Sequence, residues 1–296
     1  MEHKKIIPKL ALLIVAITWG SSFAFQEHLV EEMGPALFTF YNFLGAFLLF
    51  FLYSLYKGYS FSYRYEEGVG LGILLGTMEL TQMYGLDLSS AANTAFISNV
   101  GMLFVPFIGW LLFRHRLKAM HIVTLFVAGV GMYYLVGGVD GFGIGDGILL
   151  ISAMCMALYF VYSERFEGMP KSNMSVLCTQ QFFVVIVFMG VVLFSTDQSL
   201  AMNHSSIPSL LWQMLVFTIV PYGLIQWASK YSDEMTVAMY DGVVEPLSGG
   251  VVAWGLFRNP VTLVNMIGAF LMLVAFAWSV LIEHKKHFVY TKTKRG

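Results

Sequence analysis

Apolar segments of about twenty residues follow one another along the whole chain, with short polar stretches between them. An α-helix rises about 1.5 Å per residue, so roughly 20 apolar residues cross the hydrocarbon core of a bilayer. Ten segments meet this length, and we predict an all-α integral membrane protein with ten transmembrane helices. The predicted helices are Pro8 to Gln26, Gly34 to Tyr56, Gly68 to Leu86, Ala91 to Phe113, Met120 to Gly137, Gly145 to Ser163, Met174 to Ser195, Ile207 to Tyr231, Thr236 to Phe257 and Thr262 to Ile282.

The basic residues fall on one side of this predicted arrangement. If the N-terminus is cytoplasmic, sixteen of the seventeen Lys and Arg residues lie in inner loops and tails, and only Arg258 lies outside. Positive residues concentrate on the cytoplasmic side of membrane proteins. The pattern therefore predicts a multi-pass protein of the cytoplasmic (inner) membrane with both termini in the cytoplasm.

The two halves of the chain resemble each other. Leu12 to Glu27 matches Leu149 to Glu164 at six of sixteen positions, and Trp110 to Arg114 matches Trp254 to Arg258 at four of five. We predict a first five-helix repeat over residues 1–140 and a second over 141–296. Because five is odd, the second repeat enters the membrane inverted, as in many secondary transporters. The alternative is that apolar helices have identical residues at these positions by chance.

The first apolar segment has two interpretations. Lys4 and Lys5 precede it and Ser21, Ser22 and Ala24 follow its apolar stretch, which is typical of a cleaved signal peptide. A matching segment deep in the chain favours a retained helix instead.

Composition narrows the function classes. The chain is 57% hydrophobic and 12% charged, with a mean hydropathy of +0.71, and this is about half the usual share of charge for a soluble protein. The net charge of -1 and the scattered basic residues indicate no nucleic-acid partner. Cys155 and Cys178 lie in apolar stretches, which favours inert thiols. We expect no cofactor, no metal site and no catalytic group, and the absence of a P-loop argues against ATP hydrolysis.

Three carboxylates are predicted at membrane depth, where each costs about 2.5 to 3.5 kcal/mol on insertion scales. Glu79 lies in the third predicted helix, and Asp241 and Glu245 lie in the ninth. Asp241 and Glu245 share one helix face, and two carboxylates in a low dielectric resist ionising together. One interpretation is a site for a substrate ammonium group or a proton, with Glu79 facing it from the other repeat. In the structural alternative, Glu245 bonds a neighbouring helix and Asp241 lies in water near the cytoplasmic mouth.

Polar and aromatic side chains at helical spacing extend this site. A polar side chain facing lipid is unfavourable, so these residues are expected to point inward. The alternative for each is an interhelical hydrogen bond or an interfacial aromatic ring. Among the aromatic residues, Trp19 is the first candidate for contact with the substrate. The candidate substrate-binding residues are Trp19, Glu79, Gln82, Asn99, Tyr222, Gln226, Asp241 and Glu245, with Ser22, Gln26, Gln180 and Gln181 as inward-facing partners.

Short motifs occur in a fixed order along the chain. They are Thr18-Trp-Gly-Ser-Ser-Phe23, Ser90-Ala-Ala-Asn-Thr-Ala95, Gly145-Asp146 leading to Ala157-Leu-Tyr159, and Glu245-Pro246 followed by Ala253-Trp254. In this order and spacing they resemble the EamA type of the drug/metabolite transporter superfamily over nearly the whole chain. The resemblance implies two five-helix repeats around a central cavity, and a transporter that is commonly an exporter of amino acids or related metabolites.

The resemblance and the polar residues together favour one function over several alternatives. We expect a secondary carrier that moves a small polar metabolite by alternating access at the repeat interface. The first candidate cargo is an amino acid, moved outward, and a proton is a candidate coupling ion. The alternatives are a nucleotide-sugar or sugar-phosphate exchanger, a membrane-embedded enzyme, or a receptor or scaffold. No predicted span interior contains Lys or Arg, which favours a zwitterionic, cationic or neutral cargo. The sequence does not indicate an oligomeric state.

Overall fold

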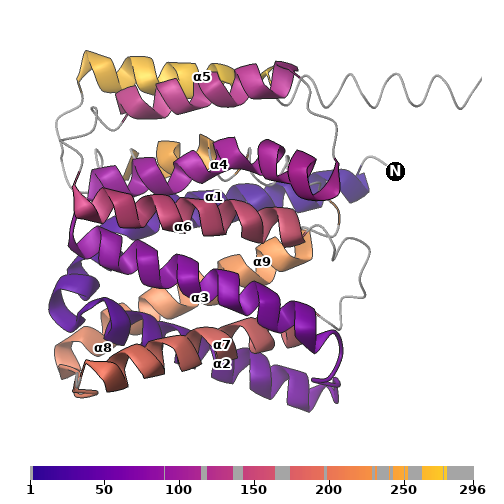
Figure 1. The fold of residues 1–296 in the computed structure, drawn as a ribbon, viewed down its shortest axis with the longest axis vertical. Helices are drawn as coiled ribbons and strands as arrows, with labels where there is room; N and C mark the ends of the chain where they lie inside the picture. Colours follow the sequence, from indigo (N-terminus) through magenta and orange to yellow (C-terminus); the bar gives the residue numbers. More distant parts are fainter. Residues whose placement is uncertain are drawn as a thin grey trace, which may run out of the picture.

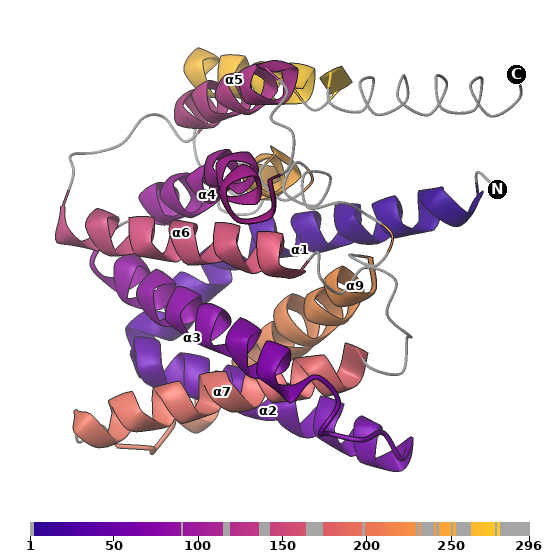
Figure 2. The same ribbon diagram turned by 45° about the vertical axis from the view of Figure 1, so that its right-hand side comes forward.

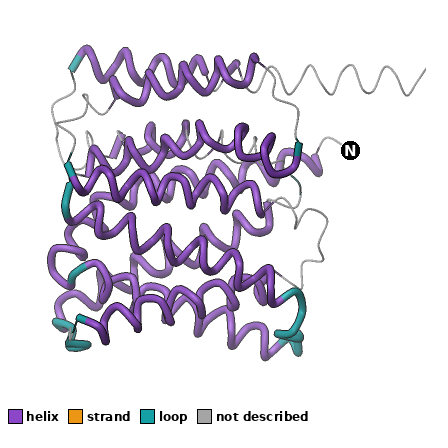
Figure 3. The backbone as a smooth tube through the Cα atoms, viewed as in Figure 1, coloured by secondary structure: helices purple, strands orange, loops and turns teal. Residues whose placement is uncertain are grey.

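Every regular element among the described residues is helical in the computed structural model of this chain (Figures 1 and 3). The structure describes residues 3–89, 91–114, 119–135, 143–163, 174–196, 199–228, 231, 240, 243–249, 251–252, 262–275 and 277–278. The first seven helices are α1 (His3–Met33), α2 (Pro35–Tyr56), α3 (Tyr65–Asp87), α4 (Ala91–Phe113), α5 (Ala119–Leu135), α6 (Ile144–Ser163) and α7 (Met174–Ser195).

A helical rod that changes type along its length follows α7. It begins with the short 3-10 turn η3 (His204–Ser206) and α8 (Ile207–Trp212), widens into the π-helix η4 (Gln213–Ile219) and ends with α9 (Val220–Ala228). This rod corresponds to the predicted eighth helix. Beyond it, helix is described at residues 243–249 and at Leu263–Ala275. Most of the predicted ninth helix lies outside the described residues.

In the described part of the chain, five helices are long and apolar enough to cross a membrane. They are Pro35–Tyr56, Phe96–Phe113, Ile144–Ser163, Met174–Ser195 and His204–Ile225. Helix α1 is a sixth candidate, in which Ile7–Ser22 and Phe25–Met33 meet at 49°. The predicted all-helical class is therefore confirmed, and the count of ten spans stays a prediction.

The ends of α1 differ from those expected from hydropathy. The predicted segment stopped at Gln26, whereas the helix continues through Glu31 to Met33. Hydropathy marks where apolar residues end, but backbone hydrogen bonds continue through the polar turns that follow. The helix ends at Gly34, whose φ of 81° is a conformation that glycine adopts without steric cost. Pro35 then begins α2 at a position where its missing N–H is not needed.

Helices from the two predicted halves pack on one another throughout the described bundle. Helix α3 packs along α6 and α7, α2 packs along α7, and α4 packs along α6 (Figure 1). Helix α1 contacts α9, and the second view shows α1 and α9 converging near the middle of the molecule (Figure 2). No separation into a 1–140 unit and a 141–296 unit is visible in this packing, since neighbours in space come from both.

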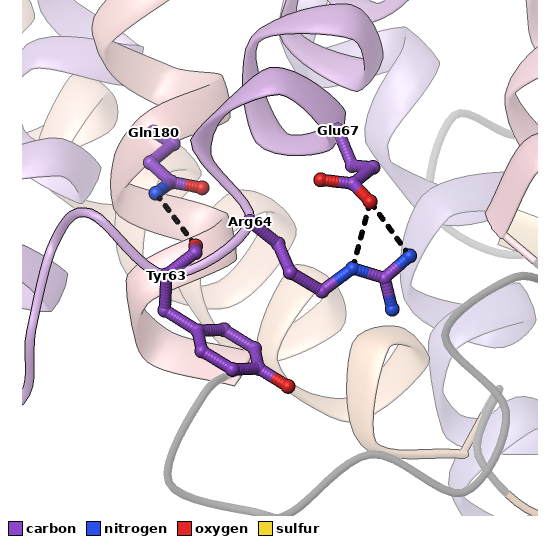
Figure 4. A network of polar contacts seen from close by, with 4 residues as sticks. All are labelled: Tyr63, Arg64, Glu67 and Gln180. Carbon is purple, nitrogen blue, oxygen red and sulfur yellow. Dashed lines mark hydrogen bonds and ion pairs between the residues drawn. The ribbon is translucent and has the colours of Figure 1, made fainter.

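The loop between α2 and α3 is fixed to α7 by side chains (Figure 4). Arg64 has a left-handed backbone, with φ 46°, just before α3. Its guanidinium forms an ion pair with Glu67 at 2.9 Å, one turn into that helix. The Gln180 amide of α7 donates to the carbonyls of Phe61 and Tyr63, at 2.8 Å and 3.2 Å. Gln180 therefore connects α7 to the loop between α2 and α3.

Helix α5 and the helix Leu263–Ala275 lie side by side at one end of the bundle (Figures 1 and 2). Gly131 and Gly268 let their backbones approach, because a Cβ on either would contact the other helix at 3.0 Å or less. The outer faces are apolar and open, with Phe126 67%, Leu263 73% and Phe270 65% exposed. Exposed apolar surface of this kind suits contact with lipid.

Gly20 lies at a close contact between α1 and residues 243–249. A Cβ at this position would overlap the backbone carbonyl oxygen of Glu245 and the Ser248 hydroxyl. The Ser248 hydroxyl also lies 3.2 Å from the carbonyl oxygen of Ala16 on α1. Substituting Gly20 therefore forces the two helices apart.

We predict that Gly20→Ala lowers the free energy of unfolding in detergent by about 1 to 3 kcal/mol, as expected for overpacking. Thermal unfolding of the purified variants measures this. Gly147→Ala in α6 is the matched control, since nothing lies within 4 Å of its added Cβ, and it should leave the unfolding temperature unchanged or raise it. An equal effect of both substitutions would contradict the backbone contact.

Candidate functional site

A cavity lined by polar and apolar side chains, and partly open to solvent, lies inside the described bundle. Its walls come from α1, α2, α3, α6, η4, α9 and residues 243–249, so both predicted halves contribute. The lining residues are Trp19, Ser22, Gln26, Asn42, Met78, Glu79, Gln82, Met156, Phe217, Thr218, Tyr222 and Glu245.

Glu79 and Tyr222 meet across the cavity. The Tyr222 hydroxyl donates a 3.0 Å hydrogen bond to Oε1 of Glu79. The Tyr222 ring is 4% exposed and makes edge-to-face contacts with Phe182 at 5.3 Å, Phe43 at 5.9 Å and Trp19 at 5.4 Å between ring centroids. The phenol is therefore held by rings on three sides while its oxygen remains at the carboxylate.

Trp19 is oriented by a backbone carbonyl of the π-helix. Its Nε1–H donates to the carbonyl of Phe217 at 3.1 Å. In an α-helix that carbonyl would accept from the residue four positions later, which is Pro221, and proline has no N–H. The wider η4 turn lies at this point, and single π turns are frequent at functional sites.

Glu245 is the second carboxylate of the cavity. Its side chain is 6% exposed and accepts a 3.1 Å hydrogen bond from Nδ2 of the buried Asn99 on α4. The Ser248 hydroxyl donates to the Glu245 carbonyl at 2.7 Å. Glu245 therefore connects to a neighbouring helix and also faces the cavity, so its two sequence interpretations are not exclusive.

Neutral polar pairs complete the wall. Asn42 of α2 and Thr218 of η4 bond each other, with Nδ2 to Oγ1 at 2.8 Å and Oγ1 to Oδ1 at 3.1 Å. The Gln82 amide donates to the Ser98 hydroxyl at 3.2 Å. The Ser22 hydroxyl donates to the Trp19 carbonyl at 2.7 Å. The described wall thus carries two carboxylates and no Lys, Arg or His side chain.

The eight candidate residues have different placements in the structure. Trp19, Glu79, Gln82, Tyr222 and Glu245 line one cavity, and Asn99 lies behind its wall on Glu245. Asp241 and the side chain of Gln226 lie outside the described residues. A role for any of them in binding stays a proposal.

The partner residues have different placements as well. Ser22 and Gln26 line the cavity as expected. Gln180 and Gln181 do not: Gln180 holds the α2–α3 loop, and Gln181 accepts a 2.8 Å hydrogen bond from the Tyr159 hydroxyl. Each of these amides bonds at one of its two ends to a partner away from the cavity. An inward direction therefore did not place these two in the cavity.

Sequence reasoning missed five lining residues. Asn42 carried a usable signal, since an amide within the apolar run of α2 needs a partner, and Thr218 carried a weaker one. Met78, Met156 and Phe217 carried no signal, because an apolar residue suits a lipid face, a core and a cavity wall equally well.

Comparison with known proteins identifies the family. A family model described as the EamA-like transporter family matches residues 7–137 and 143–281. An Archaeoglobus fulgidus protein named as an uncharacterized transporter is 29% identical over 275 residues, covering 92% of this chain and 85% of its own. A second protein of that name and organism is 21% identical over 288 residues, covering 94% and 98%.

The fold also matches a solved crystal structure. The TM-score is 0.76 over 94% of this chain and 98% of the other, at 16% sequence identity, which shows a shared fold alone. The family match extends over most of both halves and agrees with the resemblance carried by the short motifs. The chain therefore belongs to the EamA-like transporter family of the drug/metabolite transporter superfamily, and it is a membrane transporter.

Proposed function

We propose that this protein is a secondary carrier that moves a small amino compound, first an amino acid, outward across the cytoplasmic membrane by alternating access. One observation carries the proposal. A single cavity is lined by Glu79 from the first half and by Tyr222 and Glu245 from the second. A site between two halves is what alternating access requires, because movement of one half against the other opens it to each side in turn.

We further propose ten spans in two inverted repeats, residues 1–140 and 141–296, with both termini in the cytoplasm. Equivalent helix pairs support this arrangement. Gly20 of α1 packs on the carbonyl of Glu245, and Gly101 of α4 packs on the carbonyl of Ala153 in α6, where an added Cβ would lie 2.5 Å away. In the repeat alignment α1 corresponds to α6, and α4 corresponds to the ninth helix. The equivalent helix pairs thus both approach closely at a glycine, which lies on the first helix of the repeat in one pair and on the fourth in the other.

The wall chemistry supports an amino group as the recognised feature. Carboxylates attract an ammonium group, and the described lining offers no cation to a phosphate. This argues against a nucleotide-sugar or sugar-phosphate exchanger. Glu79 is also the candidate for proton coupling, because a proton and a substrate ammonium would compete for the same carboxylate.

Flux into proteoliposomes tests the carrier proposal. We expect saturable uptake of at least one labelled amino acid or amine, with a rate that responds to an imposed pH gradient. Glu79→Gln keeps the shape of the side chain but removes the charge, so it should abolish the pH response and slow the flux. Asp241→Asn tests the ninth-helix carboxylate, and Glu31→Gln, exposed near the end of α1, is the control. Absence of flux for the whole panel with folded protein would refute the proposal.

Removal of one hydroxyl tests the link between Tyr222 and Glu79. Tyr222→Phe keeps the ring contacts and removes the donor, so stability should fall by only about 1 kcal/mol. Substrate flux should nevertheless fall several-fold, because the carboxylate loses the group that positions it. Thermal unfolding and initial flux rates measured on the same preparation separate the two effects. Unchanged flux would show that the hydrogen bond is structural.

Labelling of single cysteines tests the topology. On a background with Cys155 and Cys178 replaced by Ala, Ser199→Cys lies in a loop predicted outside and Ser60→Cys in a loop predicted inside; both positions are exposed. A membrane-impermeant maleimide should label Ser199→Cys in intact cells and Ser60→Cys only after permeabilisation. The reverse pattern would invert the proposed orientation.

A further inference from the structure

We propose that the cavity selects cationic amines that carry no carboxylate, so that it binds an amine more tightly than the amino acid with the same side chain. This inference rests on the carrier function proposed above and replaces the amino acid by an amine as the preferred cargo of that same cavity. Three features of the wall carry it: its charges, its hydrogen-bond donors and its rings.

The charges of the described wall have one sign. Glu79 and Glu245 both face the cavity, and no Lys, Arg or His lines it. In the sequence, every Lys and Arg lies at the ends of the predicted spans or outside them. An ammonium group entering the cavity meets two carboxylates. A carboxylate entering with it meets the same two at short range in a low dielectric, and like charges so placed repel each other.

Six side chains of the described wall each direct a donor to an acceptor within the protein. The Trp19 indole N–H donates to Phe217 O, and the Tyr222 hydroxyl donates to Glu79. The remaining bonds are those of Ser22 to Trp19 O, Asn42 to Thr218, Thr218 to Asn42, and Gln82 to Ser98. A substrate carboxylate accepts hydrogen bonds and would compete with these acceptors for the six donors.

The two carboxylates of the same wall offer acceptor sites. An ionised carboxylate has about four acceptor sites on its two oxygens, and the Tyr222 hydroxyl engages Glu79 at Oε1 alone. An ammonium group has up to three donors and no acceptor. The hydrogen-bonding capacity of Glu79 therefore complements an ammonium group and does not complement a carboxylate.

Aromatic rings supply the third feature. Trp19, Phe217 and Tyr222 line the cavity, and the Trp19 ring is held by its indole hydrogen bond and by its 5.4 Å contact with Tyr222. A cation within about 6 Å of an aromatic face is attracted by the ring quadrupole, most strongly by tryptophan. An anion is repelled by the same face. The rings and the carboxylates thus favour the same charge.

Paired ligands test the inference. Binding of phenethylamine and phenylalanine, and of putrescine and ornithine, is measured by calorimetry on the full-length protein in lipid nanodiscs at neutral pH. Each pair differs by the carboxyl group, and phenylalanine amide serves as a ligand that keeps the side chain and the amino group without the charge of the carboxylate. We expect the amine of at least one pair to bind at least about tenfold more tightly than its amino acid, with the amide closer to the amine.

Variants assign the preference to the cavity. Glu79→Gln should reduce the ratio of amine to amino-acid affinity several-fold, and Glu79→Asp, which keeps the charge, should retain most of it. Glu31→Gln removes a carboxylate outside the cavity and should leave the ratio unchanged. Thermal unfolding of each variant identifies any that is misfolded, and the Asp variant keeps the test valid if the Gln variant is lost.

The outcomes separate the two proposals. Amino acids that bind as tightly as their amines would overturn the selectivity and leave the amino-compound carrier standing. An amine preference that Glu79→Gln and Glu31→Gln change equally would overturn its assignment to Glu79. Folded protein that neither binds nor transports any ligand of either pair, nor of the flux panel, would overturn both proposals.

Discussion

A polar group inside an apolar bundle needs a partner there, and this constraint determines the structure around the cavity. Burying an unpaired polar group costs several kcal/mol in a medium that cannot hydrogen-bond it. Glu79 is accordingly paired with Tyr222, Glu245 with Asn99, and Asn42 with Thr218. Each of these pairs connects one predicted half of the chain to the other. The polar bonds that satisfy the interior are thus also the bonds that hold the halves together.

The same constraint explains how much of the site the sequence predicted. Glu79, Tyr222 and Trp19 were found because a charged residue or a polar-tipped ring at membrane depth is conspicuous among apolar neighbours. Met78 and Met156 were not found, since their chemistry does not distinguish a cavity wall from a lipid contact. Gln180 shows the limit for polar residues: its inward direction was predictable, but its partner depended on a loop whose position only the folded chain defines.

The fold, like the site, could be predicted from the sequence only in part. Helix content and the approximate position of the described spans could be read from apolar segment length, because bilayer thickness fixes that length. The ends of α1 could not, since polar residues such as Glu31 continue a helix beyond its apolar part. The change of helix type in η4 could not be read either, because a search for apolar segments does not distinguish a π-helix from an α-helix.

The pairing of α5 with the helix Leu263–Ala275 has a consequence for how the family can vary. These helices close on each other at Gly131 and Gly268, and neither contributes a residue to the described cavity wall. Their outer side chains, such as Phe126 and Phe270, are exposed. Apolar substitutions there alter the fit to a particular lipid composition while leaving cargo recognition intact. A lineage can thus adapt this transporter to a new membrane and keep its substrate.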